Sequence, residues 1–122
     1  MNKEFGYNHL DVYQKALGIL DTASGLPAGG TLAPLFTAKA AETVTAVIDA
    51  QEAWPAENRK EGFFRARHIA HQLAPFIEVA SRNGLIKAEE AARLAGEAES
   101  VSKMLYALAK ASGPKKEESP AA

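Results

Sequence analysis

Apolar side chains and alanines recur at steps of three and four residues through most of this chain. Such steps place side chains on one face of an α-helix, whereas a half-buried strand needs strict alternation of apolar and polar residues. Alanine, a strong helix former, fills these segments, and strict alternation is absent. The pattern therefore predicts an all-α protein. It is most regular at Phe63, Ala66, Ala70, Leu73, Ile77 and Ala80.

Glycine and proline divide the periodic sequence into four segments. The first covers about residues 10–23, and the second follows residue 31 and ends before the Trp-Pro pair at 54–55. The third covers residues 58–83 and the fourth about residues 88–111. The core faces expected on the first, second and fourth helices are Leu10, Tyr13, Leu17 and Leu20; Phe36, Ala40, Val44, Val47 and Ile48; and Ala91, Leu94, Ala98, Val101, Leu105 and Leu108.

Several residues have the chemistry of helix ends. Thr31 is a predicted N-cap of the second helix, because its hydroxyl can accept a bond from a backbone N–H of the first turn. Asn58 with Glu61 three residues later resembles a capping box at the start of the third helix. At the end of that helix, Gly84 is expected in the left-handed conformation, with Leu85 folding back onto the helix.

Pro75 conflicts with a regular third helix. Proline lacks an N–H, and its ring clashes with the carbonyl four residues earlier, at His71. Either the helix kinks there or the segment forms two helices. We expect the kink, because the apolar register is unbroken from Leu73 to Ile77.

Four amphipathic helices joined by short connections must bury their apolar faces against one another, and antiparallel neighbours are the simplest solution. We therefore expect an up-down-up-down four-helix bundle over residues 9–111. An N-terminal extension, residues 1–8, precedes it. A polar tail, residues 112–122, follows and is expected to be disordered, because it has no apolar residue large enough to dock.

Composition excludes several classes of site. The 122 residues include no cysteine, which rules out disulfides, a thiolate nucleophile and Cys-ligated metals. With 14 Lys and Arg against 15 Asp and Glu, the net charge is -1, so a nucleic-acid site would have to be a local patch. No apolar run approaches the ~20 residues of a membrane span. No signal-like segment stands at the start, and we expect a cytoplasmic protein without membrane contact.

Catalytic and metal motifs are missing from the sequence. His68 and His71 are three residues apart and could share a metal, but the Glu-x-x-His pairs of metal-binding bundles are absent. No serine stands in a nucleophile elbow, and Thr31 occupies the lysine position of a phosphate loop. We expect no catalytic residue, no metal and no cofactor. An enzyme or metal protein remains the third hypothesis.

Two groups of side chains are candidates for binding. On the third helix, one narrow sector opposite the Leu73/Ile77 stripe carries potential cations around an aromatic ring, which could contact phosphates while the ring stacks on an unpaired base. The alternative is an ordinary solvated face. We call this sector, with one lysine of the second helix, the basic face: Lys39, Lys60, Phe64, Arg67, His71 and Arg82.

The second group would bury more surface between subunits. The alanine-rich stripes let helices approach closely but bury little area, so the bundle gains from further burial on self-association. The candidate contacts are Trp54, Phe64, Met104 and Tyr106. A self-assembling, non-catalytic bundle is therefore the first hypothesis, and an RNA- or DNA-binding accessory protein the second.

Short stretches in order along the chain carry a family resemblance. They are LDVYQKA at residues 10–16, RKEGFFR at 59–65, ASRNGLI at 80–86 and SKMLYAL at 102–108. In these the chain resembles the bacterial 23S ribosomal-RNA intervening-sequence proteins, also called four-helix bundle proteins. The resemblance implies a small cytosolic bundle that forms a ring-like homopentamer. The related accessory proteins of diversity-generating retroelements bind a reverse transcriptase and nucleic acid. The family's paired arginines in the second helix are missing here.

Overall fold

The computed structural model describes residues 10–27 and 30–112, and five α-helices account for most of them, with no strand among these residues. The predicted N-terminal extension and nearly all of the predicted tail lie outside the described residues. The helices are α1 (Asp11–Ser24), α2 (Leu32–Gln51), α3 (Asn58–His71), α4 (Leu73–Arg82) and α5 (Ala88–Ala111).

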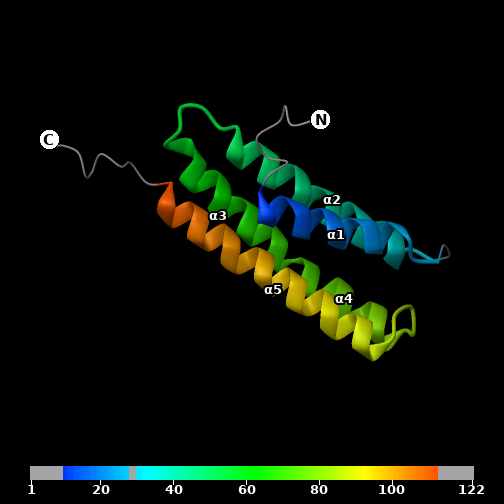
Figure 1. The fold of residues 1–122 in the computed structure, drawn as a ribbon. Coiled ribbons are helices and arrows are strands. Elements are labelled where there is room, and N and C mark those ends of the chain that lie inside the picture. The colour runs from blue at the N-terminus through cyan, green and yellow to red at the C-terminus, as the bar shows by residue number, and fades with distance from the viewer. Residues whose placement is uncertain (1–9, 28–29, 113–122) are drawn as a thin grey trace, which may run out of the picture.

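Helices α3 and α4 follow one another almost in line and together form one rod (Figure 1). α1 packs against α2 and α5, and α3 packs against the same two helices. Successive rods run in opposite directions, so the third lies diagonally across from α1 (Figure 1). The predicted all-α, up-down-up-down four-helix bundle is confirmed.

The predicted apolar stripes of three rods form the core. The third-rod stripe is buried throughout, from Phe63 to Ala80. In α2 the predicted stripe is buried except for the half-buried Ile48. In α5 Leu94, Val101 and Leu105 are fully buried, whereas the predicted Ala91, Ala98 and Leu108 are only half-buried. The three- and four-residue steps therefore identify the contact seams of these helices.

In α1 the prediction chose the wrong face. The buried residues are Val12, Ala16, Ile19 and Ala23, while the predicted Leu10, Tyr13, Leu17 and Leu20 are only half-buried at the flank of the core. Both sets follow steps of three and four, so periodicity does not distinguish them. The set with two alanines faces the centre, which lets α1 lie close to its neighbours.

The third rod is divided rather than simply kinked. α3 ends at His71 and α4 begins at Leu73. Between them, the Gln72 N–H turns to the Ile69 carbonyl, at 3.0 Å, in a tighter i→i−3 bond. Pro75 therefore lies in the first turn of α4, where a missing N–H is tolerated. The expected single kinked helix is wrong, and the two-helix alternative is correct, although the apolar register does continue across the break.

The helix ends match the sequence in part. Gly84 has φ 77°, and the Leu85 N–H donates to the Ala80 carbonyl at 2.9 Å, which is the predicted left-handed ending. Thr31 occupies the N-cap position but makes no capping side-chain bond. The predicted capping box is wrong, because Asn58 is already helical and its amide donates to the Trp54 carbonyl at 3.2 Å.

Each helix carries charged side chains on its outward face. Even α5, with 24 residues, carries charged side chains along its exposed side. Within residues 10–27 and 30–112, no helix combines the length and the apolar character that crossing a membrane requires.

Candidate interaction site along α3, α4 and α5

An open groove of about 740 Å³ runs between the third rod and α5. The side chains that line the groove are mostly small, because alanines occupy positions where longer side chains would contact one another between the helices. The lining residues are Ala70, His71, Ala74, Ile77, Glu78, Ser81, Arg82, Ala91, Ala92, Ala95, Ala98, Glu99 and Ser102. The groove is thus lined mainly by apolar side chains with a few polar ones among them, a combination suited to holding an apolar group with its orientation fixed.

One end of the groove is closed by a polar cluster between α3 and α5. His71 Nε2 lies 2.7 Å from the hydroxyl of Ser102, and Arg67 Nε donates to the same hydroxyl at 3.3 Å. Ser102 is only 8% exposed, so its hydroxyl needs these partners. The cluster fixes two cationic or potentially cationic side chains beside the groove.

An aromatic cluster continues from this end along the same seam. The Arg67 guanidinium lies 5.1 Å from the centre of the Tyr106 ring, and the Lys110 ammonium lies 5.8 Å from it. Phe64 meets Tyr106 edge to face, with ring centres 6.0 Å apart. The position of each cation over a ring face is favourable, because the ring quadrupole is negative there.

The basic face is only partly assembled. It was predicted to point away from the core, but Phe64 and Arg67 are half-buried against α5, and only His71 of this trio is exposed. Arg82 lies eleven residues beyond His71, about 16 Å along a helical rod, and forms an ion pair with Glu78 at 2.6 Å. The structure brings Phe64, Arg67 and His71 together and leaves Arg82 at the opposite end of the groove. Lys60 is half-buried near the start of α3.

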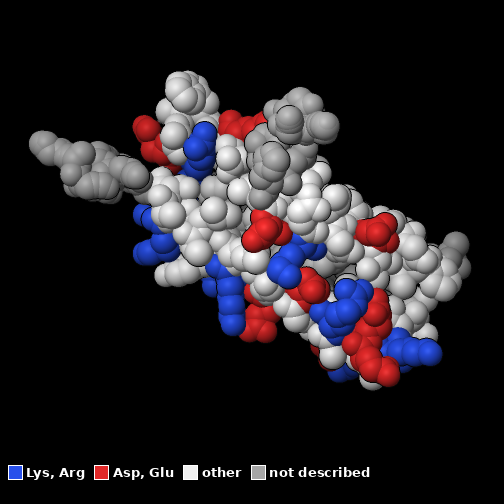
Figure 2. All heavy atoms as spheres, in the orientation of Figure 1, with Lys and Arg blue, Asp and Glu red and all other residues white. Residues whose placement is uncertain are grey.

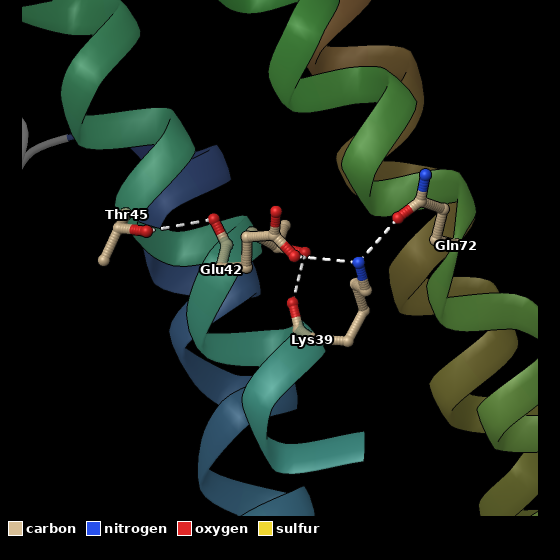
Figure 3. A network of polar contacts seen from close by, with 5 residues as sticks. Lys39, Glu42, Thr45 and Gln72 are labelled. Carbon is tan, nitrogen blue, oxygen red and sulfur yellow. Dashed lines mark hydrogen bonds and ion pairs between the residues drawn. The ribbon is translucent and has the colours of Figure 1, made fainter. Parts of the chain in front are cut away.

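Lys39 does not join the basic face. Its ammonium donates to Gln72 Oε1 at 2.7 Å and to Glu42 Oε1 at 2.8 Å, as Figure 3 shows. Thr45 in turn donates to the Glu42 backbone carbonyl at 3.1 Å. Lys39 therefore ties α2 to the break between α3 and α4.

Of the predicted oligomer contacts, Trp54 stands apart, since 83% of its surface is exposed in the α2–α3 connection. Tyr106 is 45% exposed, whereas Phe64 and Met104 are half-buried against the core. The other exposed large apolar residues of the described chain are Leu35 and Val79.

Sequence inspection missed Ser102 and Lys110 as members of the site. Both belong to α5. The partners of Ser102, Arg67 and His71, belong to α3, 31 or more residues earlier, whereas Lys110 contacts Tyr106 one turn earlier on α5 itself. Nothing in the local sequence says which face of α5 will lie beside the basic face. A serine on the border of a predicted apolar stripe was the one available signal.

Several charged side chains elsewhere form ion pairs. Figure 2 shows acidic and basic side chains intermingled where α4 and α5 meet, and basic ones gathered over the carboxyl-terminal half of α5. Arg93 Nη2 donates to Glu90 at 2.7 Å, which lowers the pKa of Glu90 and raises that of Arg93. Glu99 and Lys103, four residues apart on α5, form an ion pair at 3.5 Å.

Metal ligands do not converge in the described part of the chain, where no three His, Asp or Glu side chains are placed to hold an ion. His68 and His71 are both exposed. No protein-family model, curated protein or solved structure matches this chain.

Proposed function

We propose that this chain is a non-catalytic, self-assembling four-helix bundle protein that serves as a scaffold or interaction protein. The resemblance to the intervening-sequence proteins supports a ring of five copies in the cytoplasm. The observation that carries the proposal is the groove between the third rod and α5. Its alanine-lined surface is open on a single chain, and a partner that covered it would gain from burying it.

Self-association is also favoured by how little each helix buries. Alanines supply many of the core contacts, and an alanine removes far less apolar surface from water than a leucine or phenylalanine does. At the same time, Trp54 and Tyr106 leave large apolar side chains in solvent. Burial of these groups between copies stabilises an assembly by the same effect that stabilises the core.

Light scattering coupled to size-exclusion chromatography tests the proposal. Five copies give about five times the chain mass of 13.0 kDa, and the apparent mass should fall on dilution as the copies dissociate. A mass of 13.0 kDa throughout the micromolar range would contradict it.

A second function, RNA or DNA binding, is favoured by the aromatic cluster at Tyr106. Arg67 and Lys110 both lie over this half-exposed ring, with Phe64 at its edge. Cations beside partly exposed rings are the elements that single-stranded nucleic-acid sites combine. In a ring of copies such patches repeat, so weak contacts add by avidity.

Fluorescence anisotropy with a labelled single-stranded oligonucleotide tests this function. Affinity should fall steeply as salt rises, because phosphate contacts release counterions. Arg67→Glu should abolish binding, while Arg65→Glu makes the same charge change on an exposed position of the same helix and should retain most of it. Salt-independent affinity, or equal losses in the two variants, would exclude the Tyr106 cluster as the site.

A further inference from the structure

We infer that the groove between the third rod and α5 receives Trp54 of a second copy of this chain, so that copies associate head to tail. This inference rests on the proposed self-assembly and specifies the contact that produces it. It assigns one interface, made of two different surfaces of the same molecule.

Trp54 has an exposed side chain on an ordered turn, which suits it to insert into a partner. Its side chain is 83% exposed, yet its backbone is fixed. The Asn58 amide donates to the Trp54 carbonyl at 3.2 Å, and the Asn58 N–H donates to the Pro55 carbonyl at 2.9 Å. A ring held out on an ordered turn loses little conformational freedom when it is buried, and tryptophan is the residue most enriched among binding hot spots.

The groove offers the complementary surface. About 740 Å³ of open space over Ala74, Ala95 and Ala98 exceeds what one indole ring fills, which leaves room for the exposed Pro55 and Ala56 beside it. The small side chains let a flat ring lie close to the helix backbones.

Charges around the two surfaces also match. The connection at residues 51–57 contains Glu52 and Glu57, both exposed, and no basic residue. At the groove, the acidic side chains Glu78 and Glu99 are paired with bases of their own helices. Arg67 and His71 instead contact the neutral Ser102. Because the Arg67 guanidinium stays charged, that end of the groove carries positive charge, which favours the acidic connection.

Trp54 and the groove lie too far apart for the tryptophan to reach the groove of its own chain. Trp54 precedes α3, at the beginning of the third rod, whereas α4 forms the other end of that rod (Figure 1). Each copy therefore offers its tryptophan to one neighbour and its groove to another. A contact between unlike surfaces generates a closed ring when the rotation per copy closes, and a filament when it does not.

Two variants separate the surfaces. Trp54→Ala removes the inserted ring, and Ala95→Leu fills the groove from an exposed position of α5. Each should raise the dissociation constant ~30-fold or more, the loss expected for a central aromatic anchor. The matched controls are Leu35→Ala, which removes another exposed apolar side chain, and Ala107→Leu, which enlarges an exposed alanine of α5 outside the groove. Both should assemble like the wild type.

Mixing the two variants is the decisive experiment. Trp54→Ala keeps an intact groove, and Ala95→Leu keeps an intact tryptophan, so the two should form a one-to-one heterodimer that grows no further. Trp54 is the single tryptophan of the chain. Its emission should shift to the blue when the wild type is concentrated, and when Trp54→Ala is added to Ala95→Leu.

Each other outcome overturns the inference. If the wild type assembles and Trp54→Ala assembles equally well, the groove receives a different segment, while the proposed self-assembly survives. If both variants are monomeric and their mixture is too, the contact is not a tryptophan in the groove. Equal losses in Leu35→Ala and Trp54→Ala would show that surface apolarity in general drives association. A wild type that stays monomeric removes both proposals.

Discussion

Gly62 marks the closest approach of two helices, and enlarging it should weaken the bundle. A Cβ atom added at Gly62 would lie 2.9 Å from both the Cα and the Cβ of Ala50, on the facing turn of α2. Carbon atoms in contact prefer about 3.5–4.0 Å, so the overlap is roughly 0.6–1 Å. Ala50 is 1% exposed, and no side-chain rotation can move its Cα or Cβ away from the new methyl group. Gly62→Ala must therefore push α2 and α3 apart.

Comparison with Gly96→Ala separates the overpacking cost of Gly62→Ala from the gain in helix propensity. Gly96 is also helical, but a Cβ there has open space within 4 Å. Both substitutions gain the helix propensity of alanine over glycine, about 0.8–1 kcal/mol. Their difference in free energy of unfolding is then the overpacking cost alone, typically about 1–3 kcal/mol. We expect Gly96→Ala to stabilise the protein and Gly62→Ala to be about 1–3 kcal/mol less stable than Gly96→Ala.

Urea unfolding followed by far-UV circular dichroism, at one fixed protein concentration, measures both values. The double variant Gly62→Ala/Ala50→Gly should recover only part of the loss, because the Cα of Ala50 remains 2.9 Å from the new methyl group. Equal stabilisation by Gly62→Ala and Gly96→Ala would refute the close approach of α2 and α3.

The remaining predictions concern helix ends and polar contacts. Gly84→Ala should cost about 1–2 kcal/mol in urea unfolding, because φ 77° is unfavourable for a residue with a Cβ, and Gly84→Asn should cost less. Lys39→Ala should lower the free energy of unfolding by about 1 kcal/mol or less and leave oligonucleotide affinity unchanged, because Lys39 serves Gln72 and Glu42. Glu90→Gln should lower the thermal midpoint at neutral pH. Because the folded-state pKa of Glu90 is lowered, this difference from the wild type should disappear in acid, as pH falls through that pKa.

Features whose partners lie within two helical turns were predictable from the sequence. The Glu99–Lys103 pair and the left-handed ending at Gly84 depend on residues four or five positions apart. The buried stripes of three rods were predictable for the same reason, since helical periodicity alone places their members on one face. Pro75 predicted an interruption of the third helix. Because proline is tolerated in the first turn of a helix, the chain ends one helix at His71 and begins another at Leu73 instead of bending within a single helix.

Features that depend on which helix becomes a neighbour were not predictable. α1 has two sets of apolar residues at helical spacing, and the choice between them is made by how closely α2 and α5 approach. The basic face was expected in solvent because it lies opposite the Leu73/Ile77 stripe. α5, however, lies beside the edge of that sector, and Ser102 and Tyr106 cover Arg67.

The same missing information explains the groove. Ala70, Ala91 and Ala98 were predicted members of core stripes, and small residues at a seam normally bring two helices together. Here they line a space of about 740 Å³ that the chain itself leaves open. Such alanines contribute little to the stability of a single bundle, because each buries few apolar atoms there. They contribute more if a large ring from another copy packs against them. Trp54 is such a ring, because it is exposed in the single chain and packs against nothing there that buries it.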